Sequence, residues 1–74
     1  MRKNNYIFCN CCGKKIRQEN KVPMEDILYV KKSWGYFSKK DGSVHEFDLC
    51  EACYDHLVKQ FVLPVKISRQ KELL

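Results

Sequence analysis

Five cysteines carry the chemistry that this sequence could perform, and four of them form two Cys-x₂-Cys pairs. Cys9 pairs with Cys12, Cys50 pairs with Cys53, and 37 residues separate the two pairs. Two intervening residues allow a tight turn to point both sulfurs at one ion, and two such pairs supply the four ligands of a structural Zn²⁺ site. We therefore predict that these four thiolates bind one structural Zn²⁺.

The two cysteine pairs are expected in different local structures. Gly13 follows Cys12 and can adopt the positive φ that a metal-binding knuckle commonly requires. The second pair lies at the start of a predicted helix, where the helix dipole and the free backbone N–H groups favour thiolate over thiol. The sequence thus predicts one pair on a turn and one pair on a helix.

Disulfides and iron are the alternatives to zinc. The N-terminal segment lacks the apolar run of a secretory signal, so we expect a cytoplasmic, reducing location, where disulfides rarely persist. An odd number of cysteines also leaves one thiol over, and Cys11 is the expected non-ligand because only one residue separates it from Cys9. Rubredoxin-like iron uses four cysteines too, but Tyr54 and a predicted helix follow Cys53 where a rubredoxin has glycine.

A β-hairpin is predicted between the two cysteine pairs. Trp34–Ser38 and Val44–Leu49 flank residues 39–43, whose Asp-Gly dipeptide is a strong hairpin signal. Strand alternation places His45, Phe47 and Leu49 on a packed face, with His45 half-buried. The opposite, solvated face is expected to carry Val44, Glu46 and Asp48. A structural role for Asp48 at the start of the helix is also expected, since its carboxylate could accept backbone N–H groups there.

Helical periodicity begins at Cys50. An apolar stripe with helical spacing continues to Phe61, and Pro64 ends the predicted helix at about Leu63. Residues 18–23 are predicted to form a connecting loop, and residues 27–30 are a short β-branched and aromatic run. Residues 65–67 could add a short strand. The stripe comprises Cys50, Cys53, Tyr54, Leu57, Val58 and Phe61.

The order of knuckle, insert, hairpin and helix resembles the treble-clef class of Cys₄ zinc fingers. The resemblance rests on Cys9-x₂-Cys12-Gly13, on Asp41-Gly42, and on residues 48–53 leading into residues 54–61. The stretch WGYFSKKDGSVHEFDLCEACYD is also similar to small zinc-finger proteins of Gram-positive anaerobic bacteria. The resemblance covers most of residues 8–65 and implies a fold and a metal, whereas treble clefs serve many functions.

The chain length is consistent with this fold class. A chain of 74 residues is one small domain, whose core supplies only about 3–5 kcal/mol, so disulfides, a metal or a partner subunit must add stability. We expect a small α+β zinc-bound domain of treble-clef type over residues 1–74, with an ordered core over 6–67 and a tail over 68–74. The part played in that tail by Leu73-Leu74, and the oligomeric state, stay open.

Charge and aromatic content suggest what the domain binds. The formal net charge is +5, and residues 1–21 carry six Lys and Arg against one Glu. Four thiolates on one Zn²⁺ would lower the net charge to about +3. Lys14, Lys15 and Arg17 could contact phosphates, and Trp34 and Tyr36 could stack on bases. The same cations could instead compensate the anionic zinc site, and the same rings could fill the small core.

We expect a non-enzymatic, regulatory interaction module with a protein or a nucleic-acid partner. Four cysteine ligands leave zinc no open coordination position, which argues against an enzyme. The alternative is a DNA- or RNA-binding regulator that uses the basic N-terminal third, and a more remote alternative is a thiol redox sensor. No apolar stretch approaches the roughly 18 residues of a membrane span, so no membrane partner is expected.

Overall fold

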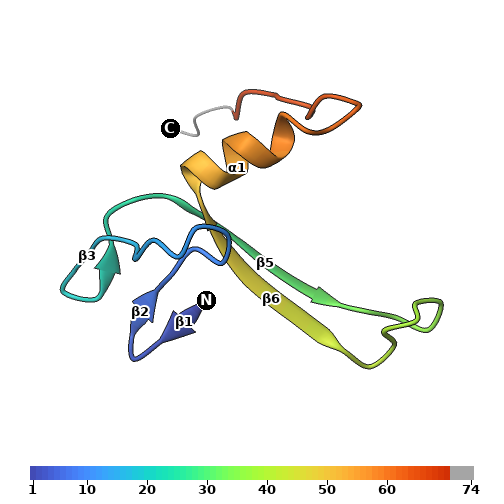
Figure 1. The fold of residues 1–74 in the computed structure, drawn as a ribbon, viewed down its shortest axis with the longest axis horizontal. Helices are drawn as coiled ribbons and strands as arrows, with labels where there is room; N and C mark the ends of the chain where they lie inside the picture. Colours follow the sequence, from blue (N-terminus) through green and yellow to red (C-terminus); the bar gives the residue numbers. More distant parts are fainter. Residues whose placement is uncertain (71–74) are drawn as a thin grey trace.

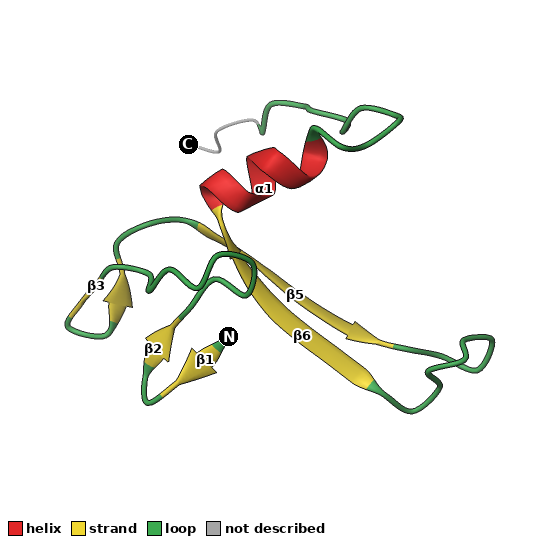
Figure 2. Cartoon of the chain, in the orientation of Figure 1, coloured by secondary structure: helices red, strands yellow, loops and turns green. Residues whose placement is uncertain are grey.

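Residues 1–70 of the chain are described by a computed structural model (Figure 1). They form a small α+β structure with three β-hairpins and one C-terminal helix (Figure 2). The α+β class and the C-terminal helix agree with the sequence prediction, which contained only one hairpin. The predicted feature Leu73-Leu74 lies outside these residues. In chain order the elements are β1 (Arg2–Lys3), β2 (Tyr6–Ile7), β3 (Gln18–Glu19), β4 (Val22–Pro23), β5 (Ile27–Ser33), β6 (Val44–Cys50) and α1 (Glu51–Val58).

The longest element is the antiparallel hairpin of β5 and β6. Its register runs from the pair Ile27 and Cys50 to the pair Ser33 and Val44, so the second cysteine pair begins where β6 ends. The prediction that Trp34–Ser38 pairs with β6 is wrong, because its partner is Ile27–Ser33. The Asp-Gly signal marks a turn correctly but does not determine how long the loop around it is.

Residues 34–43 form the loop of this hairpin, which we call the hairpin tip. Trp34 and Ser43 still pair through their backbones, since the Trp34 N–H donates to the Ser43 carbonyl at 3.0 Å. Two tight turns then close the loop, with the Ser38 N–H donating to Gly35 and the Ser43 N–H donating to Lys40. Gly42 has a φ of +85°, which fits the turn predicted at the Asp-Gly pair.

Two short hairpins precede the long one. β1 pairs with β2 across Asn4 and Asn5, whose φ angles are 52° and 67°. β3 pairs with β4 across Asn20 and Lys21, whose φ angles are 49° and 66°. Positive φ at both central residues is the backbone of a tight two-residue hairpin turn, and asparagine tolerates it well. The prediction of a connecting loop over residues 18–23 is therefore wrong, because these residues form a hairpin.

The buried core lies at the end of the long hairpin that joins α1. It consists of Ile7, Cys9, Ile16, Leu49 and Cys50. The N-terminal residues, the end of β6 and the start of α1 meet there (Figure 1). Two of the five buried hydrophobic residues are cysteines, so the core and the predicted metal site occupy the same place.

The helix is shorter than predicted and its stripe is not buried. α1 ends at Val58 rather than at about Leu63, and one further turn follows through the Gln60 N–H to the Leu57 carbonyl. None of its residues is buried, and Val62 beyond it is 96% exposed. Short helices depend on packing for their stability, so a segment without packing does not extend to Pro64. Residues 65–67, predicted as a strand, are in no strand.

The predicted packed face of β6 is present only near the core, and the predicted solvated face is present only away from it, where Val44 and Glu46 are exposed. Leu49 is buried and Phe47 half-buried, as predicted, but His45 is exposed and lies edge-on to Trp34 with ring centres 5.9 Å apart. Asp48, predicted on the solvated face, is only 2% exposed. The alternation itself is present, but residues remote in the sequence cover Asp48, whereas the neighbouring Trp34 ring leaves His45 exposed. Among the described residues no helix has the length and apolarity needed to cross a membrane.

Candidate metal centre

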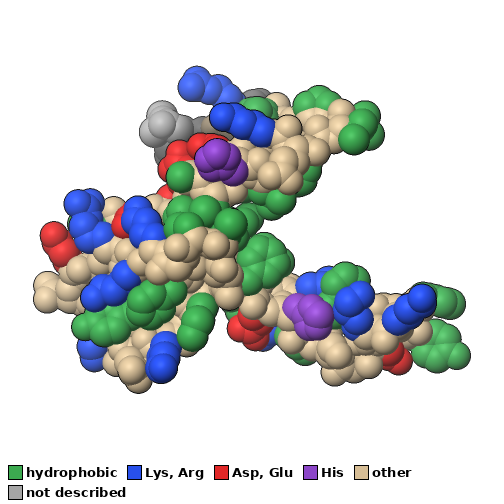
Figure 3. Space-filling view, viewed as in Figure 1, with side chains coloured by type: hydrophobic (Ala, Val, Ile, Leu, Met, Phe, Trp, Pro, Cys, Tyr) green, Lys and Arg blue, Asp and Glu red, His purple; other side chains and the backbone are tan. Residues whose placement is uncertain are grey.

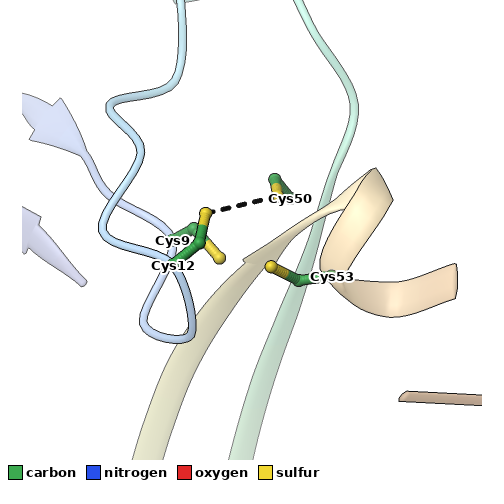
Figure 4. Close-up of side chains that lie close together, drawn as sticks. All are labelled: Cys9, Cys12, Cys50 and Cys53. Carbon is green, nitrogen blue, oxygen red and sulfur yellow. Dashed lines mark hydrogen bonds between the residues drawn. The ribbon is translucent and has the colours of Figure 1, made fainter. Parts of the chain in front are cut away.

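Four sulfurs lie close together where β6 and α1 meet the turn formed by residues 9–13, which we call the knuckle. The ligand atoms of Cys9, Cys12, Cys50 and Cys53 all lie within 4.8 Å of one another (Figure 4). Cys9 and Cys50 are buried, Cys53 is partly buried and Cys12 is exposed. Cys11 is exposed and stands outside the cluster, as predicted for the odd thiol.

The first cysteine pair sits on a tight backbone turn. The Gly13 N–H donates to the Cys9 carbonyl at 2.9 Å, and the Cys9 N–H donates to the Lys14 carbonyl at 2.8 Å. Gly13 has a φ of +80°, so the positive φ expected from its place after Cys12 is confirmed. Buried Ile7 and Ile16 are joined by a backbone hydrogen bond of 2.8 Å, which anchors the turn to the core.

The second cysteine pair sits where β6 becomes α1. Cys50 is the last residue of β6 and the N-cap of the helix, with extended φ and ψ of −73° and 163°. Cys53 lies in the first turn of α1, as predicted. No side chain caps the helix, so the role predicted for Asp48 at the helix start is wrong. The Asp48 carboxylate is bound elsewhere.

Asp48 joins the knuckle and the N-terminal hairpin to β6. Its carboxylate accepts hydrogen bonds from the Met1 amino group at 2.8 Å and from the Arg2 guanidinium at 3.1 Å. Its backbone N–H donates to Asn10 Oδ1 at 2.9 Å, and its carbonyl accepts the Asn10 N–H at 2.8 Å. Burial alone would raise the pKa of Asp48, but the hydrogen bonds from Met1 and Arg2 lower it overall.

This Asp48 network was not predicted. Asp48 is separated from its partners by 38 to 47 positions in the sequence, and no local pattern marks such pairs. The local sequence around Asp48 shows only an aspartate just before a cysteine pair. That pattern suggested a helix cap and gave no indication of the contacts with Met1, Arg2 and Asn10. The contacts with Asn10 hold β6 beside the first cysteine pair.

The local environments of the cysteine thiols give them different pKa values. Burial opposes ionisation of Cys9, yet hydrogen bonds from the backbone N–H groups of Cys12, Cys50 and Cys11 prevail and lower the pKa of Cys9 to about 6. Hydrogen bonding with the Cys50 and Cys9 side chains raises the pKa of Cys53. The cluster thus holds one thiolate readily and keeps a proton on another, which is how closely spaced thiols share charge.

The sulfur spacing fits a tetrahedral metal ion. A Zn–S bond of about 2.3 Å gives sulfur–sulfur separations of about 3.8 Å in a regular tetrahedron. Cys12 Sγ and Cys50 Sγ are 3.8 Å apart, and the remaining separations do not exceed 4.8 Å. All five cysteines are free, so no disulfide competes for these sulfurs. The structure therefore brings together a four-sulfur cluster that suits a metal such as zinc.

The cationic residues proposed for phosphate contacts already have partners within the chain. Lys14 Nζ lies 2.6 Å from Glu25 Oε1, and the Arg17 backbone N–H donates to the same carboxylate at 2.7 Å. The Glu25 carboxylate raises the pKa of Lys14. The Lys15 ammonium lies 4.1 Å from the centre of the Tyr6 ring. All three cationic side chains remain exposed, and of the three it is the Lys14 ammonium that forms an ion pair with a carboxylate.

The aromatic residues proposed for stacking lie in a different place. Trp34 and Tyr36 belong to the hairpin tip, which Figure 1 shows at the far end of the long hairpin from β2 and β3. Trp34 is partly buried, with the Lys40 and Lys32 ammonium groups 4.7 Å and 5.5 Å from its ring centre. Tyr36 is 84% exposed and its neighbour Phe37 is 100% exposed. The expectation that these rings fill the core is therefore wrong, and the predicted contact residues form two separate groups.

Comparison with known proteins identifies no relative of this chain. No family model matches it, and neither the curated proteins nor the solved structures contain a match. Its function is therefore inferred from its own residues.

Proposed function

We propose that this chain is a structural-zinc module of the treble-clef type, with one Zn²⁺ bound by Cys9, Cys12, Cys50 and Cys53. The sulfur cluster carries this proposal, because its spacing matches a tetrahedral thiolate site. The order of elements supports the treble-clef assignment, since a knuckle is followed by a hairpin and by a helix whose first turn holds the last ligand. The helix after Cys53 supports zinc over a rubredoxin-like iron site.

The metal would act as the staple of a chain with a small core. Among residues 1–70 only five hydrophobic residues are buried, and two of them are cysteines of the cluster. Zinc binding to small finger peptides is worth about 10–16 kcal/mol at neutral pH. This exceeds the roughly 3–5 kcal/mol that a core of this size supplies. Four protein thiolates also complete the coordination of zinc, so the site supports a structural role and not an enzymatic one.

These features support an interaction module, in which the metal stabilises the fold and the exposed surfaces bind a partner. The chain has large apolar side chains without cover, among them Phe37 and Val62, which favours a protein partner. The nucleic-acid alternative loses support at Lys14 in the basic N-terminal third, because Glu25 forms an ion pair with its ammonium group. It retains support at the hairpin tip, where Lys32 and Lys40 flank Trp34. Of the thiols, exposed Cys11 remains the residue on which a redox role would rest.

Metal analysis tests the proposal directly. Native mass spectrometry of protein purified without added metal is expected to show one zinc per chain. Exchange for Co²⁺ is expected to give the visible absorption of a tetrahedral thiolate site, and excess chelator is expected to abolish the cooperative thermal transition. A red, iron-loaded protein would replace zinc by iron at the same site. A metal-free chain that melts cooperatively at an unchanged temperature would contradict a structural metal altogether.

A further inference from the structure

The chain exposes far more surface than a compact protein of its size. Its accessible surface is 7075 Å² at a mass of 8.8 kDa, whereas a folded monomer of this mass exposes about 4,800 Å². Its radius of gyration is 15.3 Å, compared with about 11 Å for a compact domain of this length. A stable protein dimer buries about 800 Å² on each partner, which the excess surface more than covers.

The hairpin tip is the most exposed apolar part of the long hairpin. Tyr36 and Phe37 pack edge to face on each other, with ring centres 5.3 Å apart, and almost nothing else covers them. Four lysines stand against one aspartate between residues 31 and 43. Figure 3 shows hydrophobic and basic side chains next to each other at this end of the molecule. A partner for this tip must therefore offer an apolar surface bordered by negative charge.

The same chain carries a surface of that kind at the other end of the hairpin. A groove of about 530 Å³ lies between α1 and the start of β5, and we call it the α1–β5 groove. Its apolar lining is Ile27, Leu28 and Tyr54. Its acidic lining is Asp26, Glu51 and Asp55, which form no ion pair among the described residues. The α1–β5 groove is concave and acidic, whereas the hairpin tip protrudes and is basic, so the two surfaces are complementary.

Within one molecule the tip and the groove cannot meet. The groove lies at Ile27 and Leu28, the first residues of β5, and the tip follows Ser33, the last residue. A strand of seven residues spans about 24 Å, so the two surfaces stand at opposite ends of the hairpin. Two copies with antiparallel hairpins would place each tip beside the groove of the other copy. A two-fold axis requires such reciprocal contacts.

We propose that the chain forms a symmetric homodimer in which the hairpin tip of each copy occupies the α1–β5 groove of the other. Tyr36 and Phe37 would rest on Leu28 and Tyr54, while the tip lysines would face Asp26 and Asp55. The favoured occupant is a second copy because both complementary surfaces, apolar and charged, are present in this one chain. The inference goes beyond the metal site, since none of the groove or tip residues is a ligand.

Light scattering of the metal-loaded protein provides the first measurement. The wild-type chain is expected to have the mass of a dimer at micromolar concentration and to dissociate on dilution. Raised salt is expected to weaken the dimer because part of the contact is between opposite charges. A monomer at every concentration up to the millimolar range would overturn the proposal.

Charge exchange between tip and groove gives a sharper test. A tip variant, Lys39→Glu with Lys40→Glu, and a groove variant, Asp26→Lys with Asp55→Lys, should each dimerise at least about 100-fold more weakly because like charges then meet. An equimolar mixture should form a heterodimer, since one tip–groove contact is native and the other has both charges reversed. Variants that stay monomeric when mixed, while each retains its metal and melting temperature, would overturn the assigned surfaces.

Removal of the tip rings tests the same contact without changing any charge. Tyr36→Ser with Phe37→Ser is expected to weaken dimerisation at least about tenfold. A dimer of unchanged affinity would contradict the role of the tip. Fluorescence anisotropy with a single-stranded oligonucleotide runs in parallel. If wild type is monomeric and binds the oligonucleotide through Tyr36 and Phe37, a nucleic acid is the occupant of the tip in place of a second copy. Metal content in each sample separates these outcomes from a failure of the zinc site.

Discussion

The two ends of the long hairpin differ in almost every physical respect. At the base, β5 and β6 lie against the knuckle and α1, and this end holds Asp48, Leu49 and Cys50, all buried. At the tip, the strands continue into ten residues of which Phe37 is fully exposed and Trp34 only partly covered. The same two strands thus run from a region that determines stability into a region that is free to bind.

This difference separates folding from recognition within one small chain. The buried residues gather where the four sulfurs converge, so the energy that holds the fold is concentrated at the base. The tip contributes little to that energy because its side chains contact mainly one another and the solvent. Substitutions at the base should therefore change stability, and substitutions at the tip should change association alone.

Loss of a ligand at the base should have the largest effect. Cys50→Ser removes a buried cysteine of the cluster that is also the N-cap residue of α1. If the proposed metal binds there, the chain should lose its cooperative thermal transition, because metal binding contributes on the order of 10 kcal/mol. Circular dichroism and metal content measure this. Cys11→Ser is the matched control, since that thiol is exposed and outside the cluster. A Cys50→Ser chain that melts like wild type would refute the structural metal.

Loss of the Asp48 carboxylate should destabilise the chain less than loss of a cysteine of the cluster. Asp48→Asn keeps the backbone contacts with Asn10 but weakens the charged hydrogen bond from Arg2 at a buried position. We expect urea unfolding to show a loss of about 1–3 kcal/mol. Glu46→Gln is the control, because this carboxylate is on the same side of β6 but exposed. Equal effects of the two substitutions would show that burial of Asp48 is not what matters.

A glycine comparison should give a smaller effect. A methyl group added at Gly13 or at Gly35 meets no atom within 4 Å, but only Gly13 has a positive φ, of +80°. Gly13→Ala should therefore cost about 1–2 kcal/mol through backbone strain and weaken metal retention, whereas Gly35→Ala should be close to neutral. Competition with a chromogenic chelator measures the metal affinity of both. A larger loss in Gly35→Ala would contradict the strained-knuckle explanation.

The smallest effect on folding is expected at the tip. Phe37→Ser replaces a fully exposed ring and should leave the stability of metal-loaded monomer within about 0.5 kcal/mol of wild type. Ile16→Ala removes a side chain that is 0% exposed and should cost about 2–5 kcal/mol in the same urea experiment. Dilute samples keep dimerisation out of the measurement. A destabilised Phe37→Ser monomer would show that the tip shares in the fold after all.

Much of the metal centre could be predicted from sequence because its determinants are local. Two residues between cysteines predict a turn or a helix start, and Gly13 after Cys12 predicts a positive φ; both features are present. The combination of both pairs in one site followed from the count of four ligands. The small α+β architecture followed from the change of periodicity at Cys50.

The predictions that proved wrong concern contacts between residues that are far apart in the sequence. Local patterns gave a strand at Trp34–Ser38, a longer helix and a solvated Asp48, because propensity does not record which partner covers a segment. The two-residue turns at Asn4-Asn5 and Asn20-Lys21 had a sequence signal in their asparagines, but the flanking strands are too short to show alternation.

The sequence by itself determined the four cysteines of the cluster, the turn and helix that present them, and the surplus of positive charge. These depend on residues a few positions apart, where the backbone leaves few conformations to choose from. The tertiary structure alone decided that Ile27–Ser33 pairs with Val44–Cys50, that Asp48 is buried, and that aromatic and acidic surfaces lie at opposite ends of one hairpin. Such features arise from contacts across dozens of residues, and only the folded chain brings those residues together.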